Sequence, residues 1–271
     1  QTVLALLLSD VVSEEEYQTF ANIIRDQTEQ FLWTGQYGQI LKSLKVFEEN
    51  LLKNRFPVIN SGILRYYHSA EFIPTFIDSL RLLGRQMRKE AWSLCEYYGD
   101  EIIPDLMDTL AGEQSQTIRR FLMSLLKQFG DKIIPDAVKR LGDSRWFVKR
   151  NMLYILGECS HPDILPHVRP YCRHENRKVS VEAIKCLLNA GDRYGVEALR
   201  ECLSSDVKEL VEQAIPLSGA FRVKEAVPDL LQMLGKRGIG GADLYDKIPL
   251  VKALGEIGDP RSLDMLRELL S

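Results

Sequence analysis

The sequence has no apolar run long enough to cross a bilayer. The run from Val3 to Leu8 falls far short of the roughly 20 apolar residues that a membrane-spanning helix needs. No basic segment precedes it, so it does not have the organisation of a signal peptide. A net charge of -3 gives the whole molecule no strong attraction to nucleic acid or anionic membranes. We therefore expect no membrane association, and nucleic-acid binding only through a local basic surface.

Paired or clustered cysteines are also lacking. The chain has five cysteines, an odd number, and no two have the spacing of a metal knuckle. Most fall in helical apolar patterns, which favours reduced thiols in a core; they are Cys95, Cys159, Cys172, Cys186 and Cys202. This predicts a reducing compartment and a cytoplasmic protein. The chain begins with Gln1 rather than Met, which favours a fragment or a processed product.

Catalytic signatures are missing as well. The hydrolase motifs GxSxG and HExxH do not occur. A cluster of metal-ligand types does: Cys159, His161, His167, Cys172 and His174. These residues fall in two groups at opposite ends of an expected ten-residue helix, about 15 Å apart, so one ion could not bind both groups. We therefore expect no metal, no cofactor and no enzymatic activity.

A repeated phrase dominates what is present. GDEIIPDLMDTL at residues 99–110 returns as GDKIIPDAVKRL at residues 130–141. The prolines of this phrase, Pro74, Pro104, Pro135 and Pro166, follow one another by 30, 31 and 31 residues. The register continues at Glu197 and Pro228, and reaches Asp264 after an insertion. Such a fixed period is typical of a repeat architecture.

Each repeat predicts two helices. The first begins at the proline, which suits a first helical turn because its missing N–H would be unpaired there. The second has apolar residues at helical spacing, as in Ile118, Leu122, Leu125, Leu126 and Phe129. A glycine stands twelve residues after the start of the second helix, at Gly99, Gly130 and Gly191, and Gly130 and Gly191 are predicted to supply a left-handed stop. There is no sustained period-2 alternation and no hairpin dipeptide between apolar runs. One such pair cannot bury its apolar face alone, so we expect an all-α stack of antiparallel pairs.

Two segments carry a family resemblance. RWFVKRNMLYILGE at residues 145–158 and KALGEIGDPRSLDMLRELL at residues 252–270 resemble HEAT repeats, of the short bacterial type related to phycobilin-lyase HEAT-like repeats. The resemblance covers roughly residues 70–271. It implies a right-handed α-solenoid in which the second helices line a concave side.

The same family contains enzymes. Deoxyhypusine hydroxylases use several His-Glu dipeptides for iron, whereas this sequence has one, His174-Glu175. Alkylpurine DNA glycosylases have a cationic concave surface, which the negative net charge does not favour. The likeness to phycobilin lyases lies in repeat style, which is an analogy of fold rather than of activity.

We expect two regions. Residues 1–69 form an N-terminal helical cap, in which Ser13 and Glu16 make a capping box. Its first long helix ends near Gly35, and residues 37–52 and 57–68 form one degenerate pair. Residues 70–271 form one continuous repeat array. The Gly-rich segment at residues 235–246 lacks the order of a phosphate-binding loop and follows no strand, so we interpret it as a flexible insertion.

Cations recur near the start of the second helices, as Arg88-Lys89, Arg119-Arg120 and Lys149-Arg150. The resemblance implies that the first cation of each pair binds an aspartate of a neighbouring turn, with Asp100, Asp131 and Asp143 available. The second cation points away from the core. With further side chains it predicts a basic track along the concave groove: Lys89, Arg120, Lys127, Arg150 and Lys185, with Ser124 and Tyr154 between them. The alternative is a solvated charged face.

The predicted track has an aromatic neighbour and an end. Trp146 opens a second helix and is a candidate interface anchor, with core or inter-repeat packing as the alternative. Val181 and Gln213 replace the cations, which limits the predicted groove to the central repeats.

These observations predict a non-enzymatic scaffold that binds a protein partner, an acidic peptide or helix, along the concave face. One alternative is an enzyme or enzyme subunit of the phycobilin-lyase-like HEAT class, which would form a coloured complex with a linear tetrapyrrole. Another is nucleic-acid binding through the basic track, with an affinity that falls steeply with salt. The sequence does not indicate an oligomeric state.

Overall fold

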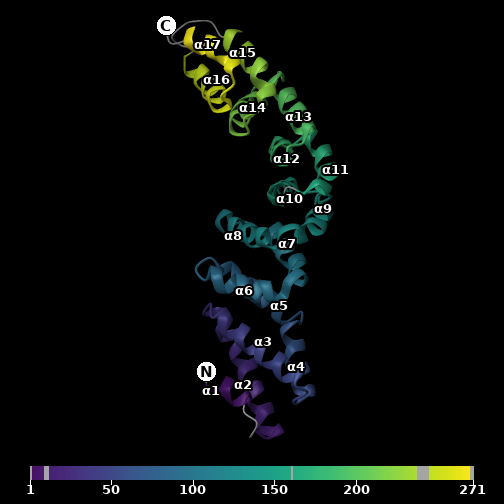
Figure 1. Ribbon diagram of the computed structural model, residues 1–271. Helices are drawn as coiled ribbons and strands as arrows, with labels where there is room; N and C mark the ends of the chain where they lie inside the picture. Colours follow the sequence, from purple (N-terminus) through teal and green to yellow (C-terminus); the bar gives the residue numbers. More distant parts are fainter. Residues whose placement is uncertain (1, 9–11, 160, 237–243, 269–271) are drawn as a thin grey trace. The chain divides into compact units, whose positions relative to one another are not determined.

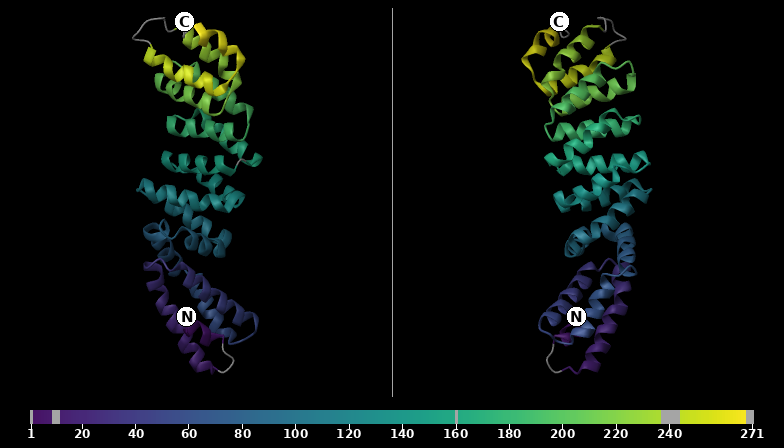
Figure 2. Two further views of the ribbon diagram at one scale, coloured as in Figure 1. Left: turned by 60° about the vertical axis from the view of Figure 1, so that its left-hand side comes forward. Right: turned by 90° about the vertical axis from the view of Figure 1, so that its right-hand side faces the viewer.

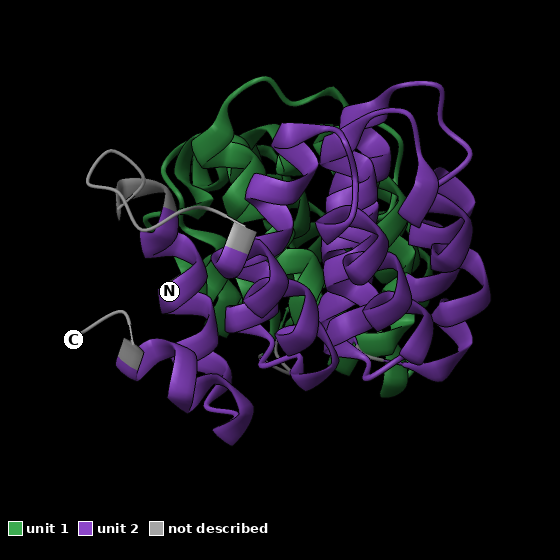
Figure 3. Ribbon diagram, turned by 90° about the horizontal axis from the view of Figure 1, so that it is seen from above, with its two compact units in different colours: residues 1–133 green, residues 134–271 purple. Residues whose placement is uncertain are grey.

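The computed structural model describes residues 2–8, 12–159, 161–236 and 244–268, and it shows no β-strand in these ranges. The regular elements are helices (Figures 1 and 2). Within these ranges no helix is both long and apolar enough to span a membrane. The chain divides into two compact units, residues 1–133 and 134–271 (Figure 3). The expected division between residues 69 and 70 stays a prediction.

Unit 1 begins with four helices: α1 (Thr2–Leu7), α2 (Glu14–Trp33), α3 (Tyr37–Leu52) and α4 (Pro57–Tyr67). The predicted capping box is present, because Ser13 Oγ accepts the N–H of Glu16 and the Glu16 carboxylate accepts the N–H of Ser13. A buried polar network joins these helices. The Tyr17 hydroxyl donates to Asn60 at 2.6 Å, and Asn50 donates to the Tyr17 oxygen at 2.9 Å. The network orients the cap without leaving these buried groups unpaired.

The rest of unit 1 is α5 (Phe72–Ser79), the π-helical turn η1 (Leu80–Gly84), α6 (Arg88–Tyr98), η2 (Gly99–Ile102), α7 (Ile103–Gly112), α8 (Gln116–Leu126) and η3 (Lys127–Ile133). Helix α7 packs against α5 and α8. Gly99 and Gly130 have φ near +58° and +59°, but ψ values of -134° and -137°. The predicted left-handed stop at Gly130 is therefore wrong, and Gly99 has the same conformation. The chain instead enters a 3-10 turn through a conformation that only glycine adopts readily.

In its described residues, unit 2 contains four helix pairs followed by a short helix. The pairs are α9 (Ile134–Arg140) with α10 (Trp146–Cys159), α11 (Leu165–Val168) with α12 (Arg177–Asn189), α13 (Arg193–Leu203) with α14 (Lys208–Ala220), and α15 (Val227–Lys236) with α16 (Leu244–Ile257). Short 3-10 turns η4 (Pro162–Ile164), η5 (Arg169–Arg173), η6 (Lys224–Ala226) and η8 (Pro260–Ser262) connect them, and α17 (Leu263–Glu268) follows. In the layer of second helices, α12 packs against α10 and α14, and α14 packs against α16.

One first helix is shorter than the expected ten residues. Helix α11 covers four residues and continues as the 3-10 turn η5. Pro170 explains the change, because it has no N–H to donate to the carbonyl four residues earlier. In contrast, the glycine stop at Gly191 is confirmed, since φ is +67° and the N–H groups of Gly191 and Asp192 bond back to Leu188 and Leu187.

Small residues set the spacing between second helices of unit 2. A Cβ added to Gly157 of α10 would lie 3.2 Å from the Cα of Cys186 on α12. A Cβ added to Gly219 of α14 would lie 2.9 Å from the Cα of Ala253 on α16. Backbone therefore meets backbone at both crossings, and a side chain at Gly219 would force the helices apart, whereas one at Gly157 would be tight.

This packing predicts opposite effects for one substitution at two equivalent glycines. Gly219→Ala should lower the stability of the protein by roughly 1–3 kcal/mol, because the new methyl group overlaps the backbone of α16. Gly255→Ala should raise it by up to about 1 kcal/mol, because alanine favours the helix and a Cβ there meets nothing within 4 Å. Urea unfolding followed by circular dichroism measures both. Equal loss of stability in the two variants would contradict a specific role for the close contact between Gly219 and the backbone of α16.

Two turns of unit 2 share an Asp-x-Arg arrangement. The Asp143 carboxylate accepts the backbone N–H of Arg145 at 2.8 Å and the guanidinium of the same residue at 2.7 Å. Asp259 makes the same contacts with Arg261, at 3.0 and 2.8 Å. The charged form of each carboxylate is therefore favoured, and its pKa falls to about 2. In each turn the aspartate carboxylate thus binds both the backbone and the guanidinium of the arginine two positions later.

The depressed pKa values predict a pH-dependent contribution to stability. A pKa lowered in the folded state stabilises the fold above the ordinary aspartate value of about 3.9, and this contribution is lost as pH falls toward about 2. Asp143→Asn should therefore lower the stability of unit 2 by roughly 1 kcal/mol at neutral pH. Well below pH 2, where the Asp143 carboxyl is protonated in both states, the variant and the wild type should unfold at the same urea concentration. Asp206→Asn, at an exposed turn residue, is the control and should change neither midpoint.

Candidate functional site

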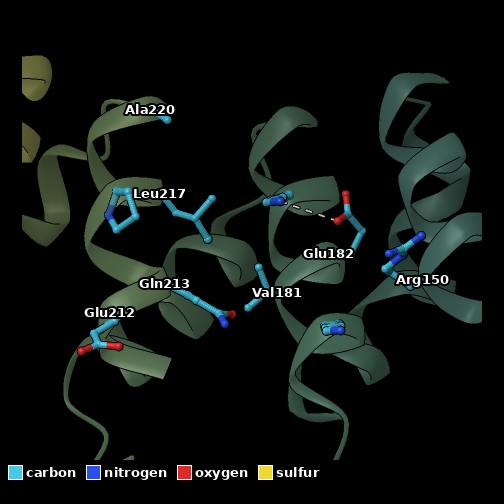
Figure 4. A pocket seen from close by; sticks show the side chains of 10 residues that line it. Arg150, Val181, Glu182, Glu212, Gln213, Leu217 and Ala220 are labelled. Carbon is cyan, nitrogen blue, oxygen red and sulfur yellow. Dashed lines mark ion pairs between the residues drawn. The ribbon is translucent and has the colours of Figure 1, made fainter. Parts of the chain in front are cut away.

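A groove runs across three second helices of unit 2, α10, α12 and α14. Its volume is about 500 Å³, and Figure 4 shows the side chains that line it. They are Arg150 from α10, Lys178, Val181, Glu182 and Lys185 from α12, and Glu212, Gln213, Pro216, Leu217 and Ala220 from α14. The core-facing sides of these helices are buried against the first helices. The groove therefore lies on a side of the second helices that the first helices do not cover.

The groove has an apolar strip on two neighbouring helices. Val181 and Leu217 are half-buried, while Pro216 and Ala220 are exposed. In Figure 4 the side chains of Val181 and Leu217 lie in the space between α12 and α14. Pro216 lies inside α14 and cannot donate the helical hydrogen bond to the carbonyl of Glu212. A strip of this kind can receive an aliphatic or aromatic side chain.

Charged side chains surround the strip. Arg150 donates to Asn151 Oδ1 at 2.6 Å, and the Nδ2 of the buried Asn151 has no hydrogen-bond partner within the described part of the chain. Lys185 pairs with Glu182 at 3.6 Å, the dashed line in Figure 4. The Lys178 ammonium lies 5.0 Å from the centre of the Trp146 ring. The three cations come from α10 and α12.

The opposite wall, on α14, has an acidic residue and no cation. Glu212 is exposed and pairs with Lys208 at 3.6 Å. Both carboxylates of the groove, Glu182 and Glu212, thus already have lysine partners on their own helices. The charge available to a ligand is therefore more positive on the α10–α12 side than on the α14 side.

Four of the predicted site residues belong to unit 2. Arg150 and Lys185 line the groove. Tyr154 is exposed on α10, and Trp146 is half-buried at the start of the same helix. Trp146 packs edge-on against Phe147 and lies under the Lys178 ammonium, so it has both packing contacts and an exposed part.

The other three predicted residues belong to unit 1. Lys89 on α6, Arg120 on α8 and Lys127 at the start of η3 are all exposed. Ser124, expected between them, is half-buried and donates to the carbonyl of Phe121 at 2.7 Å. The groove that the structure describes lies in unit 2, so it contains none of these residues. A role for them in binding stays a prediction.

The expected pairing of the first cations with neighbouring aspartates is wrong where the structure shows other partners. Asp143 pairs with Arg145, while the Lys149 ammonium lies 5.8 Å from the centre of the Tyr171 ring. Asp100 pairs with Lys132 at 2.9 Å. Arg119 donates instead to the backbone carbonyls of Glu113 and Gln114, at 3.1 and 2.8 Å. Arg145 prevails at Asp143 because it lies two residues away in the same turn.

The groove also extends further than expected. The loss of cations at Val181 and Gln213 predicts that the groove ends there, but both residues line the groove. Sequence reasoning followed the cations and therefore missed Lys178, Pro216 and Leu217. The repeat register contains the missing signal. Tyr154, Lys185 and Pro216 are spaced by 31 residues, as are Arg150, Val181 and Glu212, so both rows continue onto α14 although their charge changes.

The residues of the cysteine–histidine cluster have other roles in the structure. In the described ranges no three His, Cys, Asp or Glu residues are placed to hold an ion. His161 and His174 use Nδ1 to accept the N–H of Asp163 and Asn176, at 3.3 and 2.9 Å, and so stabilise turns. Burial raises the pKa of the Cys172 thiol to about 12. The prediction that the Gly-rich segment at residues 235–246 is a flexible insertion is not tested, because residues 237–243 lie outside the described part of the chain.

Comparison with known families fits this arrangement. Residues 134–218 match HEAT repeats, and residues 250–271 match the PBS lyase HEAT-like repeat. Unit 2 therefore contains HEAT repeats and is an α-solenoid segment. HEAT repeats generally serve as protein-interaction scaffolds. The first match includes every lining residue of the groove except Ala220. No curated protein matches the chain.

Proposed function

We propose that this chain is a scaffold that binds a protein segment in the groove of α10, α12 and α14. The observation that carries the proposal is the apolar strip of Val181, Pro216 and Leu217, left uncovered between charged side chains. Uncovered apolar surface bordered by polar groups is typical of an interaction site. Successive repeats also place the strip on rigid helices, so a ligand would meet a preformed surface.

The groove favours an amphipathic segment with acidic residues on one side. An aliphatic or aromatic side chain of the segment would cover Val181 and Leu217, as in helix-in-groove recognition. Its carboxylates would face Arg150 and Lys178 on the α10–α12 side, where the positive charge is more available. Arginine favours carboxylates because its planar guanidinium can donate two parallel hydrogen bonds.

Partner capture tests this proposal. The wild-type chain, immobilised and incubated with lysate of the source cell, should retain a partner identified by mass spectrometry. The variant Arg150→Glu/Lys178→Glu should retain it roughly tenfold less or weaker still, because charge reversal at a contact costs more than about 1 kcal/mol. Leu217→Asp should have the same effect through the apolar strip.

The matched control is Lys139→Glu, an exposed lysine on the first helix α9. It changes the net charge in the same direction and should leave capture unchanged. Circular dichroism must show equal helix content in all variants. Equal retention by wild type, Leu217→Asp and Arg150→Glu/Lys178→Glu would exclude the groove as the binding site.

A separate variant tests the predicted residues of unit 1. If Lys89 and Arg120 contact the same partner, Lys89→Glu/Arg120→Glu should weaken its capture as the unit 2 variant does. Unchanged capture would restrict binding to unit 2 and would show that the cations of unit 1 form a solvated face.

We further propose that the protein acts by binding and not by catalysis. Three of the five thiols are poor nucleophiles, since burial raises the pKa of Cys95, Cys172 and Cys186 to about 12. Incubation with a linear tetrapyrrole should therefore give no new visible absorption band and no covalent adduct by mass spectrometry. A coloured complex would instead favour the lyase-like alternative.

A further inference from the structure

One row of equivalent positions in the groove changes its chemistry at each step. Arg150 on α10, Val181 on α12 and Glu212 on α14 are spaced by 31 residues, which is one repeat, and all three line the groove. In Figure 4 they follow one another across the three helices. The row therefore reads cation, aliphatic residue, acid. We call these three residues the groove row.

The α10 end of the groove row has positive charge available to a ligand. The Arg150 guanidinium donates one of its five N–H groups to Asn151 Oδ1 at 2.6 Å, and within the described part of the chain no carboxylate pairs with it. Lys178 of the neighbouring helix is exposed, and its ammonium lies 5.0 Å from the centre of the Trp146 ring. An acidic residue of a bound segment would therefore meet two cations at this end.

The α14 end of the groove row has the opposite character. The Glu212 side chain is 57% exposed, and its partner Lys208 lies at 3.6 Å on the same helix. An exposed pair of this kind holds a carboxylate weakly, so a cation of a ligand can take the place of Lys208. The other groove carboxylate, Glu182, has a side chain that is 17% exposed. Glu212 is therefore the more accessible acid of the groove.

The spacing of the groove row matches the repeat of a helical ligand. Packed helices lie about 8–10 Å apart, so the three positions follow one another at about that interval. Residues seven apart in an α-helix share one face and are separated by about 10.5 Å along the axis. In a β-strand, a residue three positions on lies about 10 Å away but points to the opposite face. The row thus fits a helix better than a strand.

We propose that the groove selects a helical segment by the order of its charges: an acid at Arg150, an aliphatic or aromatic residue at Val181 and a base at Glu212, each seven residues from the next. This inference rests on the proposed function, because it specifies the ligand of the same groove. The acid would accept two parallel N–H groups of the guanidinium, and the base would replace Lys208 at Glu212. A segment with acids at both ends would place one beside Glu212, where like charges repel.

Selection from a displayed library of random peptides tests the charge order. Peptides of about 20 residues are long enough for the whole helical pattern. On the wild-type chain, enriched peptides should have opposite charges seven residues before and after a central apolar residue. Glu212→Lys should enrich acids at both of these positions, and Arg150→Glu should enrich bases at both. Because both outer charges then have one sign, the outcome does not depend on the direction in which a peptide binds.

Affinity measurements on single peptides add a quantitative readout. By fluorescence polarisation, a peptide enriched on the wild type should bind Glu212→Lys at least about tenfold more weakly, because its base then meets a lysine. The matched control is Glu197→Lys on the first helix α13. The Glu197 side chain is 56% exposed and also pairs within its own helix, with Arg193 at 3.1 Å. This variant should change neither the enriched pattern nor the affinity.

Leu217→Asp separates failure of the charge order from failure of the proposed function. Enriched peptides that bind Leu217→Asp as well as the wild type would exclude the groove as their site and so contradict the proposed function. Peptides that require Leu217 but have no charge order, or that have the same charges on the wild type and on Glu212→Lys, would overturn the charge order alone. A selection that enriches no peptide would contradict both proposals.

Discussion

Everything in unit 2 depends on the close approach of neighbouring second helices at small residues. Gly157 meets Cys186 at a distance that would make a Cβ tight, and Gly219 meets Ala253 at a distance that leaves no room for one. A helix pair has too little apolar core of its own to be stable, so each pair needs the next one. Because the crossing brings backbones together, the positions of successive helices are set by rigid contacts rather than by long, adaptable side chains.

This constraint decides which positions can serve binding. The core-facing side of each second helix is taken by the first helices, and the lateral sides are taken by its neighbours. Only the remaining side is free to vary. Its rows, such as Arg150, Val181 and Glu212, change from cation to aliphatic to acid while their backbone positions repeat. The fold therefore supplies a surface of fixed spacing, on which single residues determine what can bind.

Periodicity made the helices predictable, and local chemistry explains where prediction failed. The proline phrase located the first helices, and Ser13 with Glu16 located the start of α2. The shortened α11 required attention to Pro170, a second proline four residues after the first. The partner of Arg119 could not be read from spacing, because backbone carbonyls in its own turn are closer than a carboxylate of another turn. The sequence predicted the groove residues at positions where a cation repeats from one second helix to the next. It missed the groove residues at positions where the residue type changes between repeats.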